Sequence, residues 1–585
     1  MSAPAVPGGA VARVEAAYAA VAAADRPEVW VHLRPRSDVL AEAAAVDART
    51  AAGEDLPLAG QLLAVKNNVD VAGLPTTAGC PAFGSTPERD APCVARLRAA
   101  GAVVLGTANL DQFATGLVGT RSPHGAVRDA RRPDRISGGS SSGSAVAVAL
   151  GLVDLAIGTD TAGSGRVPAA LQGIVGIKAT VGVVPVDGVV PACRSWDCVT
   201  VFARDLPTAE VAMGIMAGSA RAWPSDAPLG APGAPRVAVP RDLPGLAPGW
   251  AEAFARVVDR MDADGIQVVP VDLGPFLEAA RLLYDGGLVA ERHAAVGEFV
   301  DAHRDAVDPV VGGIIGPAGT VPASRYVRDS ARLESLRAVA LASLDGIDAL
   351  VVPTAPEHPT LAEVGADPVG VNSRMGTYTN FCNLFDLCAV AVPAGSVDDG
   401  SQFGVTVLGR PFADALVADV ARRVLVPAAP PPLFATGVAR PLSPRVPWPV
   451  AAGAPAVPLV VVGAHRRGQP LVHELERRGA AWMGQVRTAA SYRLLRLDTA
   501  PPKPGLVRAP DGVSIVGERW LLSEAALGSF LAELPAPMQL GAVELDDGSW
   551  SAGFSCDAVA AATGRDISEY GDWLLALAAE QPVPG

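Results

Sequence analysis

The sequence predicts an α/β protein with at least two domains, and three observations support this fold class. Over the first 425 residues, segments with helical periodicity alternate with short apolar runs that are typical of buried strands. The chain has 585 residues, 50% of them hydrophobic, and exceeds the usual size of one domain. A proline- and alanine-rich tract then separates the last of these helices from a segment of short strands.

The first part of the chain is expected to alternate between helices and strands. Small apolar residues at helical spacing predict surface helices at 13–24 and 39–52. The apolar run 61–65 predicts a buried strand that ends at Lys66. The elements expected after it are a helix closed by Gly101, a strand at 103–105, a Gly/Ser turn at 138–143, a helix at 144–152, strands at 155–158, 349–352, 387–395 and 403–409, and helices at 249–263, 277–302, 323–344 and 413–425.

The expected division is a first domain at 1–425, a linker at 426–458 and a second domain at 459–585. Proline cannot donate to a strand ladder, so the proline-rich tract predicts a semi-extended linker. Beyond it, the runs LVVVGAH, YRLLRLD, GVSIVGERWLL and LGAVELDD predict a small α+β domain.

The composition narrows the range of partners and cofactors. A formal net charge of −14 leaves no basic stripe of the kind that nucleic acid or anionic lipid attracts, so we expect neither as a partner. The N-terminus lacks the pattern of a secretion signal, and no apolar run is long enough to span a membrane, so we expect a soluble, cytoplasmic protein. The seven cysteines are scattered and form no C-x-x-C pair, so we expect neither a disulfide scaffold nor a metal site.

The rarity of lysine makes each lysine informative. Arginine has replaced lysine almost everywhere, and the lysines that remain are Lys66, Lys178 and Lys503. A lysine kept in such a background is one whose titratable amine is needed.

The stretch GGSSSGSAVAVALGLVDLAIGTDTAGSGR, residues 138–166, contains several serines and no histidine. A nucleophilic serine needs a base within hydrogen-bond reach and donors aimed at the developing oxyanion. The fold could bring a histidine from elsewhere, but a buried, neutral lysine is the alternative, because desolvation lowers the pKa of lysine. Lys66, at the end of an apolar strand, meets that demand, and the TDTAGS run offers small residues whose N–H groups can converge on one oxygen.

These residues resemble the amidase signature family. The stretch above with its continuation VPAALQGIVGIKAT is similar to the family signature, and LLAVKNNVDVAGLPTTAGCPAF is similar to its lysine strand. The resemblance implies a mixed β-sheet core covered by helices and a Ser-cisSer-Lys triad. In that triad Ser164 is the nucleophile, Ser140 is the middle serine on a cis peptide bond, and Lys66 is the base.

The resemblance also implies an oxyanion hole made by Thr161, Ala162 and Gly163 with the amide of Ser164. The sequence departs from the family at one position: Asn67 follows the lysine where the family commonly has aspartate. That change is expected to affect how the lysine is held or its pKa, and it removes no member of the triad.

Within this family the chain resembles the allophanate hydrolases more narrowly. LLYDGGLVAERHAAVGEF is similar to a segment in which Tyr284 and Arg292 would hold the terminal carboxylate of allophanate, a task that suits a guanidinium fork. The alternative is a surface helix on which Arg292 pairs with a nearby acid. The segment NSRMGTYTNFCNLFDLCAVAVPAG resembles a late core segment of the same family. Its Asn380 is expected either to line the substrate pocket or to have only a packing role.

The tail resembles the C-terminal domain of allophanate hydrolases, which is similar to the γ-glutamylcyclotransferase-like barrel and is implicated in decarboxylating the first product. The stretches that carry this resemblance include VVVGAHRRGQPLVHELERRGA and LPAPMQLGAVELDDGSWSAGFSC, and GVSIVGERWLL departs from it. Of the two histidines here, we expect His465 rather than His473 to act as the acid–base group. The alternative for each of them is a structural role.

The hypothesis from sequence is therefore a cofactor- and metal-independent allophanate hydrolase of urea or s-triazine nitrogen catabolism. No A/V-M-K-M tetrapeptide marks a biotin site, so a coupled urea carboxylase is expected on another protein. The resemblance implies a homodimer. One alternative is another amidase-signature enzyme, either an amidase or part of an amidotransferase. The other, from a different class, is a catalytically silent binding module.

Overall fold

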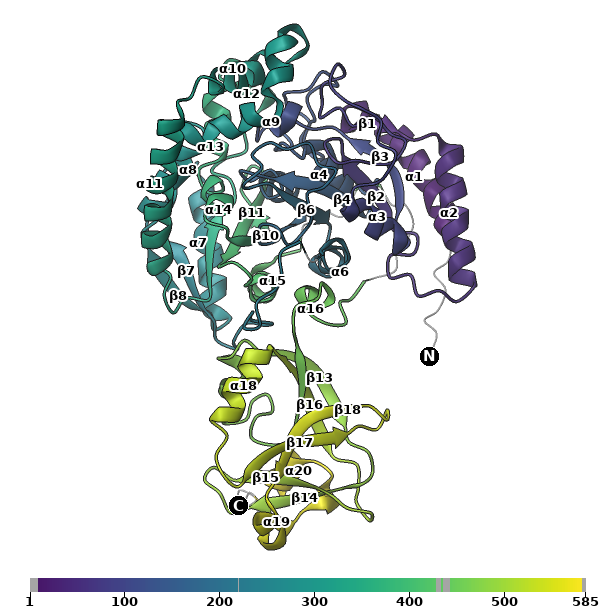
Figure 1. Ribbon diagram of the computed structural model, residues 1–585, viewed down its shortest axis with the longest axis vertical. Helices are drawn as coiled ribbons and strands as arrows, with labels where there is room; N and C mark the ends of the chain where they lie inside the picture. Colours follow the sequence, from purple (N-terminus) through teal and green to yellow (C-terminus); the bar gives the residue numbers. More distant parts are fainter. Residues whose placement is uncertain (1–8, 219, 428–432, 435–441, 581–585) are drawn as a thin grey trace. The chain divides into compact units, whose positions relative to one another are not determined.

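The computed structural model describes residues 9–218, 220–427, 433–434 and 442–580, and Figure 1 shows its helices and strands. The chain forms two compact units, Met1–Ala222 with Pro235–Trp448, and Trp223–Ala234 with Pro449–Gly585. The expected linker lies partly outside the described residues, at 428–432 and 435–441. The sequence did not predict that Trp223–Ala234 belongs with the C-terminal unit, where the N–H groups of Leu229 and Gly230 donate to the carbonyl of Gly479 at 2.8 and 3.1 Å.

The first unit is built on one mixed sheet with the strand order β1-β3-β2-β4-β6-β5-β10-β11-β9-β7-β8. Strand β2 is parallel to β3 and β4, whereas β6 is antiparallel to β4 and β5. This confirms the predicted α/β class and the mixed sheet. The strands are β1 Trp30–Leu33, β2 Leu62–Lys66, β3 Val103–Ala108, β4 Leu155–Asp160, β5 Val175–Lys178, β6 Cys198–Ala203, β7 Arg236–Pro240, β8 Gln267–Val271, β9 Ala349–Pro353, β10 Cys388–Ser396 and β11 Gln402–Gly409.

Helices flank this sheet, and most of the expected ones are present within a few residues of their predicted bounds. The α-helices of the unit are α1 Ala10–Ala24, α2 Arg36–Ala51, α3 Pro92–Ala99, α4 Ser142–Leu150, α5 Val167–Gln172, α6 Leu206–Met216, α7 Trp250–Ala263, α8 Gly274–Leu282, α9 Ala290–Ala302, α10 Pro309–Ala318, α11 Ala323–Ala342, α12 Leu361–Ala366, α13 Gly370–Met375, α14 Asn380–Leu384 and α15 Asp414–Val424, and α16 Trp448–Ala451 lies at the boundary of the two units. Elements that were not predicted include strands β1 and β5 to β8 and helices α5, α6, α10 and α12 to α14.

One expectation is wrong: the helix at 277–302 is two helices, α8 and α9, joined by the 3₁₀ turn Gly287–Val289. Gly286 adopts an extended conformation between them. Gly287 lies so close to α11 that an added Cβ would be 2.8 Å from the amide nitrogen of Tyr326. The break lies between Tyr284 and Arg292, so the two residues belong to different segments of the chain.

Helix α4 packs against the central strands β2, β3, β4 and β6, as Figure 1 shows. All nine of its residues are buried, and small side chains make this possible. At its first turn, an added Cβ on Gly143 would be 2.6 Å from the amide nitrogen of Asn109. The hydroxyl of Ser144 is satisfied by the carbonyl of Ile157 at 2.8 Å. The start of this helix is therefore fixed against the sheet.

The second unit is a small α+β domain, as predicted. It contains a five-stranded sheet, β13-β16-β12-β18-β17, and a three-stranded sheet, β15-β14-β19. Leu459, Leu495 and Phe554 belong to one core cluster that joins the two sheets. Its strands are β12 Val457–Val461, β13 Ala481–Arg487, β14 Tyr492–Leu497, β15 Lys503–Arg508, β16 Val516–Leu522, β17 Met538–Glu544, β18 Trp550–Cys556 and β19 Arg565–Asp566, and its helices are α17 His473–Glu476, α18 Glu524–Ala532, α19 Ala558–Thr563 and α20 Trp573–Glu580.

Among the residues that the structure describes, none of the helices has the length and apolar character needed to cross a bilayer.

Candidate active site

Lys66 ends strand β2 with its side chain fully buried. Its Nζ lies 2.8 Å from the hydroxyl oxygen of Ser140 and donates to the hydroxyl oxygen of Thr159 at 2.7 Å. Burial lowers the pKa of Lys66 to about 7, although the carboxylates of Asp111, Asp160 and Asp197 act in the opposite direction. A neutral amine has a lone pair, so this lysine can accept a proton near neutral pH.

The other buried lysine of the unit behaves differently. Lys178 donates to the carbonyl of Ala179 at 2.8 Å. Burial lowers its pKa, but the neighbouring Cys198, Cys382 and Asp160 outweigh burial and hold the pKa above the ordinary range. Lys178 therefore keeps its proton, and the environment rather than burial alone distinguishes the two lysines.

Ser140 precedes helix α4, and its peptide bond with Gly139 is cis, as the resemblance implies. Its side chain is fully buried beside Lys66. The loop that carries it packs against the first turn of α5, the helix that directly follows the Ser164 turn, because an added Cβ on Gly138 would be 2.8 Å from the Cα of Pro168. The two serine loops are therefore neighbours in the fold.

Ser164 lies in the turn between β4 and α5 and is 3% exposed. Within the described part of the chain, its hydroxyl has no hydrogen-bond partner. The relay step between Ser140 and Ser164 therefore stays a prediction.

The turn that carries Ser164 is held by a buried ion pair. Both carboxylate oxygens of Asp160 accept from the guanidinium of Arg166, at 2.9 and 3.0 Å, and both side chains are fully buried. The same carboxylate accepts from the N–H groups of Gly163 at 2.9 Å and Gly165 at 3.0 Å. Four donors on one carboxylate fix the backbone on both sides of Ser164.

The hydrogen bond from Gly163 to Asp160 changes the set of N–H groups expected to form the oxyanion hole. The N–H of Gly163 already donates to Asp160, so it is not free to meet an oxyanion. Among the described residues, the N–H groups of Thr161, Ala162 and Ser164 have no acceptor. Gly163 has φ near +124°, a conformation that favours glycine, so its role is to shape the turn.

Asn67, the position at which the sequence departs from the family, has a structural role. Its side-chain amide donates to the carbonyl of Pro75 at 2.8 Å and to the hydroxyl of Thr107 at 3.0 Å, and its oxygen accepts from Thr77. It therefore ties the loop after β2 to strand β3 rather than contacting the lysine. Two residues that sequence reasoning missed lie beside the lysine: the amide of Asn68 donates at 3.3 Å to the hydroxyl of Thr159, which Lys66 also contacts.

Arg292 and Tyr284, predicted to bind a carboxylate, come together in the structure. Arg292 is 1% exposed, and its guanidinium donates to the phenol oxygen of Tyr284 at 2.8 Å and to the hydroxyl of Thr115 at 2.9 Å. Its carbon Cζ lies 5.0 Å from the centre of the Tyr284 ring. Its Nε is buried with no partner.

The alternative for Arg292, a surface helix with an acidic partner, is therefore wrong. Across the described ranges, no carboxylate pairs with this guanidinium. A buried cation without an anion is costly, so the site is suited to an anion that arrives with the substrate.

The predicted pocket residue Asn380 is buried at the start of α14, and its side-chain oxygen has no partner. Two neighbours hold the nucleophile turn instead. The hydroxyl of Thr379 donates to the carbonyl of Ala162 at 2.7 Å, and the amide of Asn383 donates to the carbonyl of Asp160 at 2.8 Å. Only a weak signal marks them in the sequence, a cluster of polar residues in an otherwise apolar segment.

His465 lies just after β12 in the second unit and is 6% exposed, whereas His473 is exposed. Its Nε2 lies 2.9 Å from a carboxylate oxygen of Glu474, and its ring stacks on Phe554 at 4.9 Å. Burial lowers the pKa of His465, and Glu474 acts in the opposite direction. It lines a small cavity with Lys503 and Met538.

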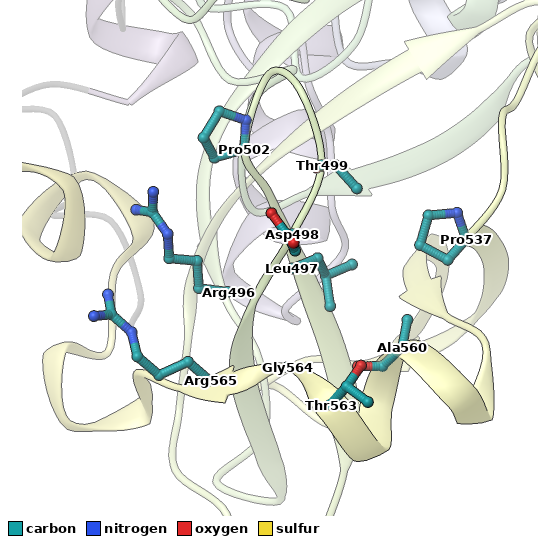
Figure 2. Close-up of a pocket in the computed structure, with 10 residues that line it drawn as sticks. All are labelled: Arg496, Leu497, Asp498, Thr499, Pro502, Pro537, Ala560, Thr563, Gly564 and Arg565. Atoms are coloured by element: carbon teal, nitrogen blue, oxygen red, sulfur yellow. The ribbon is translucent and has the colours of Figure 1, made fainter.

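A larger pocket in this unit, about 550 Å³, is shown in Figure 2. Arg496 and Arg565 line it from neighbouring strands, at directly opposed positions of β14 and β19. Both pair with Glu580 of helix α20. A carboxylate between two like charges stabilises this pair of strands, so the arginines have a structural role.

Within the described residues, no cluster of three histidine, cysteine or acidic side chains could hold a metal ion.

The two units match known families. Residues 12–418 match the Amidase family, and residues 457–578 match the Allophanate hydrolase C-terminal domain. The chain therefore belongs to the amidase family, and it is an amidohydrolase.

The chain is similar in structure to Kluyveromyces lactis allophanate hydrolase, with a TM-score of 0.86 and 36% identity. The match covers 98% of this chain and 97% of that one. It is 39% identical over 563 residues to urea amidolyase of Saccharomyces cerevisiae, covering 93% of this chain. It spans 31% of that relative's length. It is 34% identical to a glutamyl-tRNA(Gln) amidotransferase subunit from Symbiobacterium thermophilum, over 71% of this chain and 93% of that protein.

Proposed function

We propose that this amidohydrolase cleaves the terminal amide of allophanate, H₂N–CO–NH–COO⁻, in urea degradation. The observation that carries the proposal is Arg292, a buried guanidinium beside Tyr284 with no carboxylate partner in the described chain. Allophanate is a small amide with one carboxylate, and an Arg fork with a phenol hydroxyl suits that group. The similarity to K. lactis allophanate hydrolase supports the same assignment.

The first step is an acyl transfer to Ser164. Neutral Lys66 accepts the proton of Ser140 while Ser140 accepts that of Ser164, whose oxygen attacks the amide carbonyl. The free N–H groups of Thr161, Ala162 and Ser164 are the oxyanion donors in this scheme, and Gly163 holds the turn. The proton returns to the leaving nitrogen, and ammonia departs.

Water then reverses the relay. It loses a proton through Ser140 to Lys66, and its oxygen attacks the acyl carbonyl. The C–O bond to Ser164 breaks, and the proton returns through Ser140 to the Ser164 oxygen. In total, allophanate and water give the dicarboxylate ⁻OOC–NH–COO⁻ and ammonium, so atoms and charge balance.

The C-terminal unit is proposed to act on this dicarboxylate. Loss of CO₂ breaks one C–N bond, and the nitrogen takes a proton to give carbamate, which decomposes to ammonia and CO₂. His465 is the proposed proton donor. Because Nε2–H donates to Glu474, only the imidazolium form can give a proton from Nδ1, and Glu474 favours that form against the effect of burial.

Three further parts of the proposal rest on the resemblance: a homodimer, a cytoplasmic location and coupling to urea carboxylase activity. The name of the S. cerevisiae relative, urea amidolyase, is consistent with the last of these. Sedimentation of the purified chain tests the dimer directly.

The decisive experiment measures ammonia release from allophanate and from uncharged malonamide. Wild type should prefer allophanate, Ser164→Ala should release no ammonia, and Arg292→Ala should raise the KM for allophanate while leaving malonamide turnover little changed. Equal turnover of both amides by wild type would favour a general amidase instead.

A further inference from the structure

Asp197 is a buried carboxylate that no step above uses. It lies directly before β6, is 7% exposed, and accepts three hydrogen bonds. Two come from the backbone, from the N–H of Ala192 at 2.9 Å and from that of Cys193 at 3.1 Å. The third comes from the hydroxyl of Thr161 at 2.5 Å. The carboxylate therefore joins the segment before β6 to the first residue of the nucleophile turn.

The contact with Thr161 bears on the chemistry because of where this threonine lies. Thr161 follows β4 directly, and its N–H is one of the free donors assigned to the oxyanion hole. Asp160 fixes the later part of the same turn through Gly163 and Gly165. Asp197 fixes its beginning, so two carboxylates hold the turn from its two ends.

Asp197 also contributes to the electrostatics of the site. The charged groups that act on Lys66 are the carboxylates of Asp111, Asp160 and Asp197, which raise its pKa, and the guanidinium of Arg292, which lowers it. Arg292 in turn interacts with Asp197, and this interaction lowers the pKa of the carboxylate against the larger effect of burial. The negative charge of Asp197 therefore acts on both the base and the anion-binding arginine.

We propose that Asp197 is a positioning residue: its carboxylate, held by the N–H groups of Ala192 and Cys193, accepts from the Thr161 hydroxyl and so orients the N–H of Thr161 for the oxyanion hole. The inference rests on the proposed function, because it assumes that Lys66 and Ser164 form the nucleophilic machinery. The contact with Thr161 and the charge of the carboxylate are tested by separate variants. Thr161→Val removes the hydroxyl contact and keeps the charge, whereas Asp197→Asn removes the charge.

The test measures the rate at which a fluorophosphonate labels Ser164 in the full chain, from pH 5 to pH 9. It needs no assumption about the natural amide, so it is independent of substrate choice. Thr161→Val keeps the backbone N–H and removes only the hydroxyl that orients it, so we expect slower labelling with an unchanged pH midpoint, by less than the roughly 100-fold that loss of a whole oxyanion donor costs. Thr161→Ser, which keeps the hydroxyl, should restore most of the rate.

Asp197→Asn should slow labelling and also shift the midpoint of the acid limb to lower pH. The direction follows from the sign of the charge: removing a carboxylate that raises the pKa of Lys66 lets the amine stay neutral at lower pH. A purely structural role would slow labelling without moving the midpoint. Circular dichroism and thermal melting of each variant establish that it is folded.

The outcomes separate the two proposals. If wild type is not labelled at Ser164, the proposed function fails. If wild type is labelled but Asp197→Asn keeps the wild-type midpoint, or Thr161→Val keeps the wild-type rate, the inference about Asp197 is overturned and the proposed function stands. If Asp197→Asn does not fold, substituting Asp197→Glu, which keeps the charge but displaces it, should slow labelling without an acid shift, and a wild-type rate would overturn the inference.

Discussion

The amine nitrogen of Lys66 lies 2.8 Å from the hydroxyl oxygen of Ser140, and both side chains are fully buried. Burial lowers the pKa of this amine to about 7, so a large share of it is neutral at neutral pH and can accept the serine proton. The pairing gives the chain a base where its nucleophile stretch has no histidine.

The rate of amide cleavage should depend on pH through Lys66. Because burial lowers its pKa to about 7, the amine is neutral above that pH and charged below it. We expect kcat to rise through an acid limb centred near pH 7 and to fall about tenfold per pH unit well below it. Steady-state ammonia release between pH 5 and pH 9 measures this, and a flat profile would contradict the assignment of Lys66 as the base.

The two buried lysines should respond oppositely to substitution by methionine. The unfolded chain holds the Lys66 proton up to about its ordinary pKa of 10.5, whereas the folded chain loses it above about 7. The buried amine therefore destabilises the fold fully below pH 7 and progressively less towards pH 10.5. Lys66→Met should raise the free energy of unfolding at pH 6, by up to about 5 kcal/mol from the shift alone, and abolish activity.

Lys178→Met is the matched control. Its pKa is raised in the folded state, so its charge contributes stability at pH values below its unfolded pKa, and that contribution is lost as pH rises through the folded pKa. The substitution should lower the free energy of unfolding at pH 7. Denaturant titrations at pH 6 and pH 9 measure both variants, and equal effects would show that the two environments do not differ as described.

Asn383 should matter more than its neighbour Asn380. The Asn383 side chain donates to the carbonyl oxygens of Asp160 and Trp196 and accepts from Arg166. Asn383→Leu would leave these buried groups unpaired, and we expect a loss of roughly 2–4 kcal/mol in the free energy of unfolding together with a lower kcat.

Asn380 lies on the same helix, α14, and its oxygen has no partner. Asn380→Leu should therefore cost less than about 1 kcal/mol. Chemical denaturation of both variants compares them, and a larger loss for Asn380→Leu would mean that the polar network around Asp160 does not hold the turn.

Gly163→Ala should reduce activity sharply. The residue has φ near +124°, and an added Cβ would meet the side chain of Thr379. The turn would have to move, and Ser164 moves with it. We expect at least a tenfold fall in kcat, an order set by misplacement of the reacting group. Gly541→Ala is the control, because an added Cβ there would meet only the Ser555 hydroxyl oxygen at 3.8 Å, and it should leave kcat unchanged.

His465→Ala separates the two proposed steps. With ¹³C-labelled allophanate followed by NMR, the variant should convert the amide and accumulate the dicarboxylate, because the proton donor of the second step is missing. If the variant released CO₂ as fast as wild type, His465 would not be the proton donor of the second step.

The sequence located the chemistry better than the architecture around it. An apolar run ending in a rare lysine predicts a buried amine, and β2 places Lys66 there. The family signature then directs attention to Ser140 and Ser164. These are local patterns, so they are visible along one stretch of chain.

Features that depend on distant segments could not be predicted in the same way. The helix expected at 277–302 is broken at Gly287, which packs against α11, and Tyr284 before the break contacts Arg292 after it. The lack of an acidic partner for Arg292 within the described residues is likewise a property of the whole fold.

The oxyanion turn illustrates the limit of motif transfer. Its residues were named from the signature, but the signature does not say which N–H groups are already in use. Asp160 accepts a hydrogen bond from the N–H of Gly163, and Asp197 accepts one from the hydroxyl of Thr161. Asp160 is the last residue of β4 and Asp197 directly precedes β6, and an acidic residue at the end of a buried strand is the signal that could have marked both.

The central claim is that neutral Lys66 activates Ser164, and the most direct measurement is peptide mass spectrometry after fluorophosphonate treatment at pH 8. The adduct is expected on Ser164 in wild type and in Lys178→Met, and Lys66→Met should form it at least about 100-fold more slowly. An adduct on another residue, or equal labelling of Lys66→Met, would contradict the account.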